Sequence, residues 1–373
     1  MGRPITQHGE LVGDQGVVGY VHSHAPNLPP AGPLPDCGSS PSAGCRGSVL
    51  FSEPEEIEDP VSDSDAPALH AVLADLSTER VNEKYADLDL LPTPELVAAM
   101  NAEDAQVAPA VALVTDAIAT AVDNISERML RGGRLIYLGA GTPGRLGVLD
   151  ASEAPPTFGI DPARIVGVIA GGPAALVTAV EGAEDDADAG AADVAGLSVG
   201  PDDSVVGISA SGRTPYVLAA VAEARRRGAF TVGVACNAAS ALGTAAEVGI
   251  DVVVGPELLT GSTRLKAGTA QKMVLNMLST LTMVRLGKTW GNLMVDLKAS
   301  NEKLVARSER TVMLATGVDA ATASRTLAAV GGSVKAAILV ELAGIRPAAA
   351  ELLLAQHDGF LRRALDAAPA AGN

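Results

Sequence analysis

Residues 135–147 have the sequence LIYLGAGTPGRLG, an apolar run followed at once by a loop rich in glycine. Consecutive apolar residues fit a strand that is buried on both of its faces. The glycines at positions 139, 141 and 144 match the G-x-G-x-x-G pattern, in which a tight turn leads from a strand into a helix. The segment therefore predicts the first strand–helix unit of an α/β sheet.

Four more apolar runs follow this first strand, and stretches with helical spacing separate them. They lie at Ile165–Ala170, Val205–Ser209, Thr231–Cys236 and Ile250–Val254. Strands that alternate with helices are typical of a parallel sheet covered on both faces. We therefore expect an α/β fold with a doubly wound, five-stranded parallel sheet.

The rest of the chain predicts a tail and a second set of helices. Residues 1–75 hold 10 of the 23 prolines and carry 11 acidic side chains against two arginines, so we expect this tail to be disordered. The sheet domain is expected at 76–300, with amphipathic helices at Val107–Arg131 and Thr263–Gly287. Beyond it, Ala- and Leu-rich stretches broken by glycines predict a small C-terminal helical domain at 301–373.

Composition excludes several classes of function. The 27 Lys and Arg residues face 44 Asp and Glu residues, so the chain lacks the basic face that a nucleic-acid-binding protein needs. No apolar run reaches the ~18 residues of a membrane span, so we expect no membrane partner. The first residues lack the pattern of a signal peptide, and three cysteines in a chain of this length suit a reducing compartment. We therefore expect a cytoplasmic protein.

Histidine is scarce in the part of the chain that we expect to fold. Four of the five histidines lie within residues 1–75, and only His357 lies beyond them. This distribution argues against a Ser-His-Asp triad and against a metal site built from several histidines. Acid–base chemistry is therefore expected to fall to carboxylates, lysine or tyrosine.

Ligands of doubly wound sheets bind at the carboxyl ends of the strands, so the loops after the strands are candidate binding segments. The loop at Gly139–Gly147, with Gly141, Thr142 and Arg145, offers backbone N–H groups that suit a phosphate. A dinucleotide is less favoured, because the second strand ends at Ala170 without the acidic residue that binds a ribose. A tight turn without a ligand is the alternative.

The loop after the third predicted strand supplies three hydroxyl groups, from Ser209, Ser211 and Thr214, ahead of a helix that begins near Pro215. Hydroxyls and helix N-terminal amides bind phosphate without needing a net positive charge. An ordinary helix cap at Thr214 is the alternative. Two such loops in one sheet favour a sugar phosphate as the ligand.

Two glutamates are candidates for acid–base chemistry. Glu153 precedes Pro155-Pro156, where we expect its helix to end. A carboxylate at that end opposes the helix dipole, so it is not there for local stability. Glu184 follows an expected helix at Ala174–Val180, although an acidic residue there can also simply begin the next helix.

A last polar cluster precedes the long helix. Residues 255–269 include Ser262, Arg264 and Lys266. Hydroxyls and cations around a helix N-terminus suit an anion or a sugar. A capped helix with a surface salt bridge is the alternative.

Together, these motifs resemble the N-acetylmuramic acid 6-phosphate etherase family, whose members have the sugar-isomerase (SIS) fold. The matching segments are LGAGT (138–142), GRLG (144–147), DASE (150–153), AVEGAED (179–185), GISASGRTPY (207–216), TGSTRLKAGTAQK (260–272) and GNLMVD (291–296). The pattern from Gly255 to Lys266 is shared with the glucokinase regulatory protein, a non-catalytic relative.

The resemblance implies that water replaces D-lactate at C3 of N-acetylmuramate 6-phosphate, without a metal or a cofactor, in the recycling of cell-wall sugars. It implies that Glu153 is the acid that protonates the lactate oxygen and that Glu184 is the second catalytic residue. The residues that it assigns to substrate binding are Gly141, Thr142, Arg145, Ser209, Ser211, Thr214, Ser262 and Lys266.

The resemblance also implies a homodimer with sites near its interface. One departure matters: the family usually has Ser where Pro143 stands, and proline removes a hydroxyl and an N–H from the loop. Two alternatives stay open, a non-catalytic sugar-phosphate regulator and an aldose–ketose isomerase on the same fold. The presence of both Glu153 and Glu184 favours the enzyme over the regulator, and the Ser262–Lys266 motif argues against the isomerase.

Overall fold

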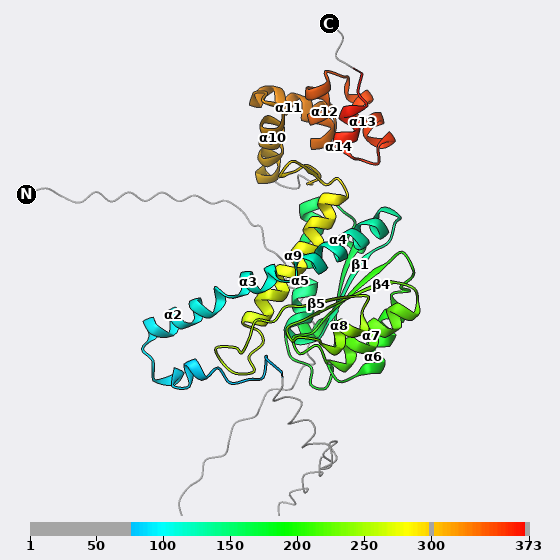
Figure 1. Ribbon diagram of the computed structural model, residues 1–373. Helices are drawn as coiled ribbons and strands as arrows, with labels where there is room; N and C mark the ends of the chain where they lie inside the picture. The colour runs from blue at the N-terminus through cyan, green and yellow to red at the C-terminus, as the bar shows by residue number, and fades with distance from the viewer. Residues whose placement is uncertain (1–75, 298–301, 370–373) are drawn as a thin grey trace, which may run out of the picture. The chain divides into compact units, whose positions relative to one another are not determined.

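The computed structural model describes residues 76–297 and 302–369, and the predicted tail at 1–75 lies outside them. Its centre is a five-stranded sheet in which every neighbouring pair of strands is parallel, with the order β2-β1-β3-β4-β5 (Figure 1). The strands are β1 (Leu135–Gly139), β2 (Ile165–Ile169), β3 (Ser204–Ile208), β4 (Phe230–Ala235) and β5 (Val248–Asp251). The predicted sheet is confirmed. The last strand begins earlier than predicted, because β4 pairs Val232 with Val248.

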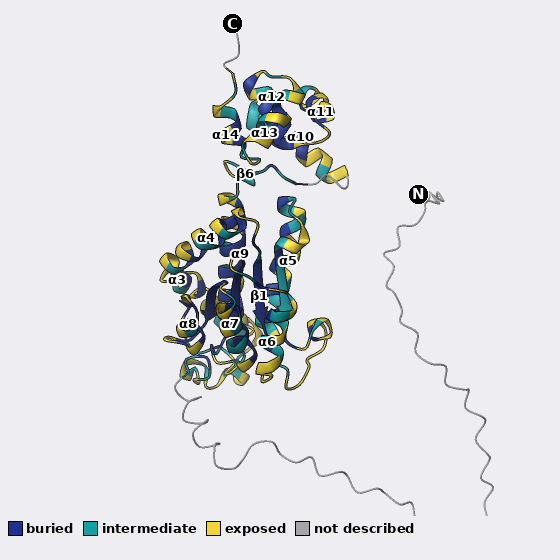
Figure 2. Cartoon of the chain, turned by 90° about the vertical axis from the view of Figure 1, so that its right-hand side faces the viewer, coloured by how far each residue is buried: buried dark blue, intermediate teal, exposed yellow. Residues whose placement is uncertain are grey.

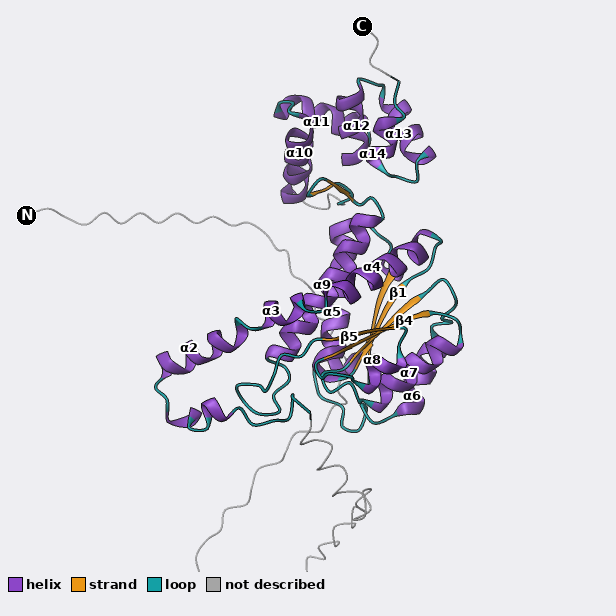
Figure 3. Cartoon of the chain, in the orientation of Figure 1, coloured by secondary structure: helices purple, strands orange, loops and turns teal. Residues whose placement is uncertain are grey.

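Helices cover both faces of the sheet (Figure 3). One layer contains α4 (Thr115–Leu130), α5 (Gly141–Phe158) and α9 (Lys266–Arg285), and the other contains α6 (Ala187–Gly196), α7 (Pro215–Arg226) and α8 (Ala241–Ala245). Alternate residues of β1 serve the two layers: Tyr137 belongs to the first core, and Ile136 and Leu138 belong to the second. The sheet is therefore buried on both sides, as Figure 2 shows.

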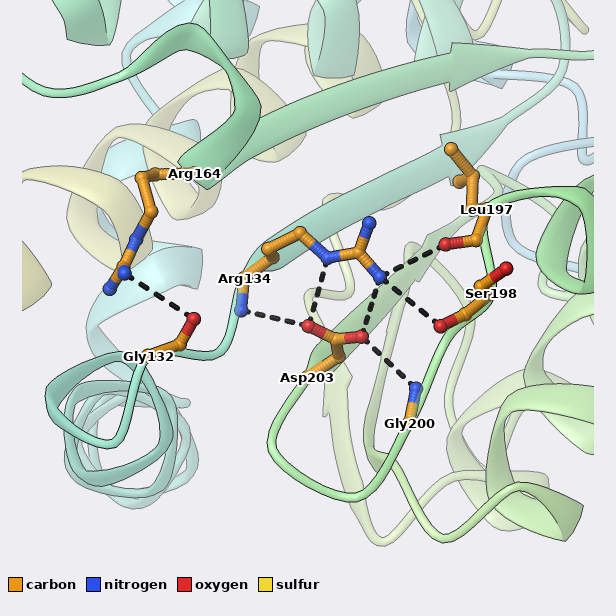
Figure 4. A network of polar contacts seen from close by, with 7 residues as sticks. All are labelled: Gly132, Arg134, Arg164, Leu197, Ser198, Gly200 and Asp203. Atoms are coloured by element: carbon orange, nitrogen blue, oxygen red, sulfur yellow. Dashed lines mark hydrogen bonds and ion pairs between the residues drawn. The ribbon is translucent and has the colours of Figure 1, made fainter.

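A polar network at the amino ends of β1 and β3 ties these two strands together (Figure 4). The backbone N–H and the Nε of Arg134 donate to Asp203 Oδ1 over 2.9 and 3.0 Å, and Arg134 Nη2 donates to Oδ2 over 2.7 Å. Burial raises the pKa of Asp203, but the guanidinium and the backbone donors outweigh it, so the pKa lies below its ordinary value. At the carboxyl ends of the same two strands, Gly139 pairs with Ile208. By holding β1 and β3 together, the network therefore also helps to set where the loops after these strands begin.

α5 differs from its prediction at both ends. It begins directly at Gly141, so the glycine-rich loop is its first turn rather than a separate segment. It also continues through Pro155-Pro156 to the buried Phe158, which anchors its last turn on the core. The prediction that this helix ends before the prolines was wrong, and Glu153 lies within the helix.

α5 packs closely on the sheet because glycines face the strands. A Cβ atom at Gly144 would lie 2.5 Å from the carbonyl oxygen of Gly139, and one at Gly147 would lie 2.9 Å from Tyr137 Cβ. A side chain at either position would push the helix away from the sheet. The glycine pattern therefore serves the packing of this unit as well as its loop.

The helix predicted at Val107–Arg131 is divided in two. It forms α3 (Val107–Ala112) and α4, and at this break the helical segment Thr93–Ala112 and α4 enclose an angle of 61°. At the break, Val114 leaves the helical conformation, and the Thr115 hydroxyl donates to the carbonyl of Ala112. Among residues 76–297 and 302–369, no single helix combines the length and the apolar composition of a membrane span, and two bent helix pairs do so only when taken together.

Five short helices follow the sheet, and glycines separate them as predicted. They are α10 (Glu302–Thr316), α11 (Ala320–Ala329), α12 (Val334–Ala343), α13 (Pro347–Gln356) and α14 (Leu361–Asp366). They enclose a core of their own, which includes Val312 and Ile338. A hairpin of β6 (Thr289–Trp290) and β7 (Leu293–Met294) precedes them. It was not predicted, because two-residue strands carry no periodic pattern. The domain boundaries at 76–300 and 301–373 stay a prediction.

Candidate active site

The loops after β1 and β3 begin side by side at the carboxyl edge of the sheet. These strands are neighbours, and Gly139 pairs with Ile208, so residues 140–142 and 209–214 start from adjacent positions. The strand order reverses between β1 and β3, and ligands of doubly wound sheets bind in the crevice at such a point. The two loops predicted to bind phosphate are therefore close together.

A cavity of about 210 Å³, here called the α5 N-terminal cavity, opens beside the first of these loops. The first turn of α5 lines it with Gly141 and Arg145, and the loop after β2 lines it with Glu181 and Glu184. The amide groups of a first helical turn have no acceptor within the helix, and the dipole adds positive potential there. This end of α5 suits an anion, while Glu184 supplies a carboxylate from the facing loop.

Arg145 holds the segment that follows β2. Its Nη2 and Nε atoms donate to the carbonyl groups of Ala175 and Leu176 over 2.6 and 3.1 Å. The prediction of a helix at Ala174–Val180 was wrong. The segment forms only a short 3-10 turn, η4 (Pro173–Leu176), because these carbonyl groups accept hydrogen bonds from Arg145 instead of from the next turn of a helix. Arg145 therefore braces the cavity wall, and its contact with substrate stays a prediction.

The loop after β3 gathers three hydroxyl groups. Ser209 Oγ lies 2.8 Å from Thr214 Oγ1 and 3.3 Å from Ser211 Oγ, and it accepts the Gly212 N–H over 3.0 Å. Thr214 stands at the N-cap position of α7, yet its side chain makes no capping bond. The ordinary cap, which was the alternative at this residue, is therefore not found. Instead the three hydroxyls form one cluster at the N-terminal end of α7.

A backbone hydrogen bond brings Glu184 to the same helix end. The Tyr216 N–H, in the first turn of α7, donates to the carbonyl of Glu184 over 3.1 Å. Tyr216 is itself fully buried, and its hydroxyl donates to Asp193 over 2.5 Å. Burial, together with Asp193, raises the pKa of Tyr216. The backbone of Glu184 is therefore fixed at the first turn of α7, while its exposed side chain lines the cavity beside the first turn of α5.

The polar segment before α9 is largely engaged within the chain. Both carboxylate oxygens of Glu257 accept backbone N–H groups, from Lys266 and Ala267, over 3.0 Å. Lys266 Nζ donates to Glu103 of α2 (Thr93–Asp104) over 2.6 Å, in a pair that is nearly buried. Burial raises the pKa of Glu103, but Lys266 outweighs this effect and leaves the pKa below its ordinary value. Lys266 does not line the α5 N-terminal cavity, and its contact with substrate stays a prediction.

Thr142 and Ser262 lie beside the polar segment before α9. A Cβ atom at Gly268 would be 3.5 Å from Thr142 Cγ2, so the Thr142 side chain reaches from α5 to the start of α9. Ser262 is half-buried in the loop that leads into α9. The structure places both residues at this edge of the sheet, and their contacts with substrate stay predictions.

Glu153 lines a different cavity of about 470 Å³, here called the α5–α9 cavity. Its other walls are formed by α9 and the β6–β7 hairpin, with Asn276, Thr289 and Asn292 among the lining residues. Glu153 is twelve residues beyond Gly141 in the same helix, a separation of about 18 Å along the axis. The structure therefore does not bring Glu153 and Glu184 together within one chain.

Asp150 is a residue of this second cavity that sequence reasoning missed. It is only 6% exposed, and it accepts hydrogen bonds from Tyr137 over 2.9 Å, from Asn276 over 2.7 Å and from Ser279 over 3.1 Å. Burial raises the pKa of Asp150, and the three donors oppose this rise. The available signal was its spacing from Glu153, because residues three apart share one face of a helix.

The described residues were also compared with the ligand sets of metal sites and with reactive cysteines. In the part of the chain that the structure describes, no three His, Cys, Asp or Glu side chains are grouped to hold a metal ion. Cys236 is a buried free thiol, and burial raises its pKa.

Comparison with known proteins agrees with this arrangement. The profile of the SIS domain matches residues 186–281, and that of the glucokinase regulatory protein N-terminal SIS domain matches residues 117–225. The N-acetylmuramic acid 6-phosphate etherase of Streptomyces avermitilis is 61% identical over 302 residues, which cover 81% of this chain and 97% of that one. The etherase of Rubrobacter xylanophilus is 55% identical, over 79% of this chain and 97% of that one. The predicted SIS fold is confirmed, and the chain belongs to the N-acetylmuramic acid 6-phosphate etherase family.

Proposed function

We propose that this protein cleaves the lactyl ether of N-acetylmuramate 6-phosphate with water, which yields N-acetylglucosamine 6-phosphate and D-lactate. One observation carries the proposal: Glu184 lines a cavity with the first turn of α5, and its backbone carbonyl accepts a hydrogen bond from the first turn of α7, next to the hydroxyl cluster, in a chain 61% identical to an etherase. The two loops suit a phosphate without needing a basic residue. The carboxylate beside them suits proton transfer on the attached sugar.

The proposed reaction is an elimination followed by a hydration. The phosphate binds to the amides of the first turn of α5 and to the hydroxyls of Ser209, Ser211 and Thr214. The open-chain aldehyde acidifies the C2 proton of the sugar, and Glu184 removes it. The electron pair forms the C2–C3 double bond as the C3–O bond breaks, and Glu153 protonates the departing lactate oxygen. Water then adds its hydroxyl to C3 and a proton to C2, so no electrons are gained or lost overall.

We infer that the working site is built from two copies of the chain. Glu184 lines the α5 N-terminal cavity, whereas Glu153 lines the α5–α9 cavity, about 18 Å further along the same helix. One hexose phosphate cannot contact both groups within a single chain. In a dimer with twofold symmetry, the same surface of each copy meets its partner. Glu153 of one copy can then face Glu184 of the other, which supports a homodimer.

We also propose that the protein is cytoplasmic. Three cysteines in 373 residues suit a reducing compartment. The one cysteine within the described ranges, Cys236, is a free and buried thiol, as expected of a protein that does not depend on disulfides.

Release of D-lactate from N-acetylmuramate 6-phosphate tests the proposed function. Glu153→Gln keeps the shape of the side chain but cannot deliver a proton, so we expect lactate release to fall by about 100-fold or more. Binding of the sugar phosphate should persist, because its expected contacts lie on other residues. The matched control is Asp123→Asn, which removes an exposed carboxylate from α4 and should leave lactate release unchanged.

Exchange of the C2 proton with deuterated water separates the two glutamates. Glu184→Gln should lose both exchange and turnover, whereas Glu153→Gln should still exchange. A wild-type protein that binds the sugar phosphate but releases no lactate would instead be a regulator. Interconversion of an aldose and a ketose phosphate would support an isomerase.

A further inference from the structure

The α5–α9 cavity is acidic. Asp150 and Glu153 are the titratable residues among the described residues that line it, and these lining residues include no Lys, Arg or His. Even one ionised carboxylate repels a second anion, and no lining cation offsets that repulsion. The phosphate and the lactate carboxylate of the proposed substrate are therefore the parts least suited to this cavity, and a neutral part of the sugar suits it best.

The rest of the lining suits an acetamido group. Phe158 and Met294 supply apolar surface, and Asn276 and Asn292 supply amide groups. An acetamido group combines a methyl group with an N–H and a carbonyl oxygen, so it fits a cavity that is mainly apolar and holds a few polar partners. In N-acetylmuramate 6-phosphate this group is attached to C2, next to the C3 atom where Glu153 is proposed to act.

Asp150 fixes the orientation of the Asn276 side chain. Asn276 Nδ2 donates to Asp150 Oδ1 over 2.7 Å, and the Ser279 hydroxyl donates to the same oxygen over 3.1 Å. The amide nitrogen must face this oxygen, because the amide oxygen is itself an acceptor and has no proton to donate. Asp150 is buried, and the Tyr137 hydroxyl holds its other oxygen over 2.9 Å. The amide group of Asn276 is therefore held in one orientation rather than two.

This orientation leaves the carbonyl oxygen of Asn276 available to a ligand. Among residues 76–297 and 302–369, no group donates to Asn276 Oδ1, and the side chain is half-buried in the cavity wall. The oxygen can accept a hydrogen bond from an N–H or an O–H group. An acetamido group presents an N–H, whereas an ionised carboxylate presents only acceptors. Hydrogen bonding and charge therefore favour the same part of the substrate.

We propose that Asn276 is a substrate-binding residue that accepts a hydrogen bond from the acetamido N–H, and that Asp150 is the positioning residue that holds the Asn276 amide for this contact. The inference rests on the proposed function, which supplies an N-acetylated sugar phosphate and brings its C3 atom to Glu153. It assigns the α5–α9 cavity of one copy to the acetamido end of the sugar, while the phosphate binds at the α5 N-terminal cavity of the other copy.

Two sugar phosphates separate this contact from the rest of the site. N-acetylglucosamine 6-phosphate carries the acetamido group, whereas 2-deoxyglucose 6-phosphate carries only hydrogen at C2. Titration calorimetry of the full chain should show that the wild type binds the first sugar more tightly. Asn276→Ala should reduce this preference by about three- to tenfold, the effect of one hydrogen bond between neutral groups, and should leave the affinity for 2-deoxyglucose 6-phosphate unchanged. The matched control is Asn101→Ala, which alters an exposed asparagine of α2 and should keep the wild-type preference.

Asp150→Asn tests the positioning role. The amide that it introduces can meet Asn276 through its oxygen or through its nitrogen, so the Asn276 amide is no longer held in one orientation. We expect part of the preference for the acetamido sugar to be lost while the affinity for 2-deoxyglucose 6-phosphate is kept. A general loss of structure would instead weaken the binding of both sugars.

The inference is wrong if the wild type shows no preference for the acetamido sugar, if Asn276→Ala keeps that preference, or if Asn276→Ala weakens the binding of both sugars equally. A preference kept in Asp150→Asn would overturn the positioning role. If Asn276→Ala does not fold, Asp150→Asn decides between the same outcomes. Lactate release is measured separately: a wild type that prefers the acetamido sugar but releases no lactate would contradict the proposed function and still support this contact.

Discussion

Pro143 lies in the first turn of α5, at the helix end that faces the α5 N-terminal cavity. Proline is tolerated there because the amides of a first turn have no acceptor within the helix. It nevertheless withholds one N–H from a phosphate, and it lacks the hydroxyl of the serine that is usual in the family. The cost of this residue should therefore appear in substrate affinity rather than in stability.

We expect Pro143→Ser to tighten binding of the sugar phosphate by about 100-fold, because it restores two donors, an N–H and a hydroxyl, and each hydrogen bond to a charged group adds about tenfold. Titration calorimetry measures this affinity with N-acetylglucosamine 6-phosphate, which carries the same phosphate. Pro143→Ala is the matched control, because it restores the N–H without the hydroxyl and should give an intermediate gain. Equal affinities for all three proteins would show that this turn does not contact the phosphate.

Individual site residues were predictable where a side chain suited to the ligand also directly follows a predicted strand. Ser209, Ser211 and Thr214 follow an apolar run, so the sequence alone places their hydroxyls at the carboxyl edge of the sheet. Lys266 was expected at the site because it stands near a helix start. Its ammonium group instead meets Glu103, 163 residues away in the sequence, and no local pattern reveals such a partner.

At the scale of elements, the strands were most predictable where they are buried runs of mainly apolar residues, as in β1, β3 and β4, and least predictable at β5, where only Ile250 is buried. The helices were less so, since tertiary contacts overrode local preference. α5 continues through two prolines because Phe158 is anchored in the core, and η4 stays short because Arg145 binds its carbonyl groups. Local sequence alone does not contain these contacts.

The Arg134–Asp203 network joins β1 to β3, the two strands that carry the phosphate loops. Asp203→Asn should lower the free energy of unfolding at pH 7 by about 1–3 kcal/mol, because the partly buried guanidinium loses its charged partner. Folding lowers the pKa of Asp203, so its contribution is present above the unfolded value near 4 and is lost as the pH falls through the lower folded value. Urea denaturation should therefore show that the variant and the wild type become closer in their free energy of unfolding as the pH falls.

Asp202→Asn is the matched control for this prediction. Asp202 pairs with Arg131 over 2.8 Å, but both side chains are about half exposed. Exposed pairs contribute about 0–1 kcal/mol, so this variant should unfold almost as the wild type does. Equal losses in the two variants would mean that the Arg134–Asp203 network has no special role in holding the strands.

At the scale of the whole molecule, the separation of Glu153 from Glu184 depends on how far α5 extends. The prediction that the helix ends before Pro155 left Glu153 at a helix terminus, where its distance from the other glutamate could not be judged. A continuous helix places Glu153 about 18 Å along its axis from Gly141, and the two glutamates line different cavities. In a homodimer with twofold symmetry, Glu153 of one copy can then act together with Glu184 of the other.

Mixing two inactive variants tests whether each site is shared between copies. If Glu153 of one copy works with Glu184 of the other, a heterodimer of Glu153→Gln and Glu184→Gln has one intact site and one doubly altered site. Random pairing makes half of the dimers heterodimers, so coexpression should restore about a quarter of wild-type lactate release. Mixing the wild type with the double variant is the matched control. Shared sites leave about a quarter of the activity in that mixture, whereas sites within one chain leave about half. No recovery in the first mixture and half activity in the second would place both glutamates of a site in the same chain.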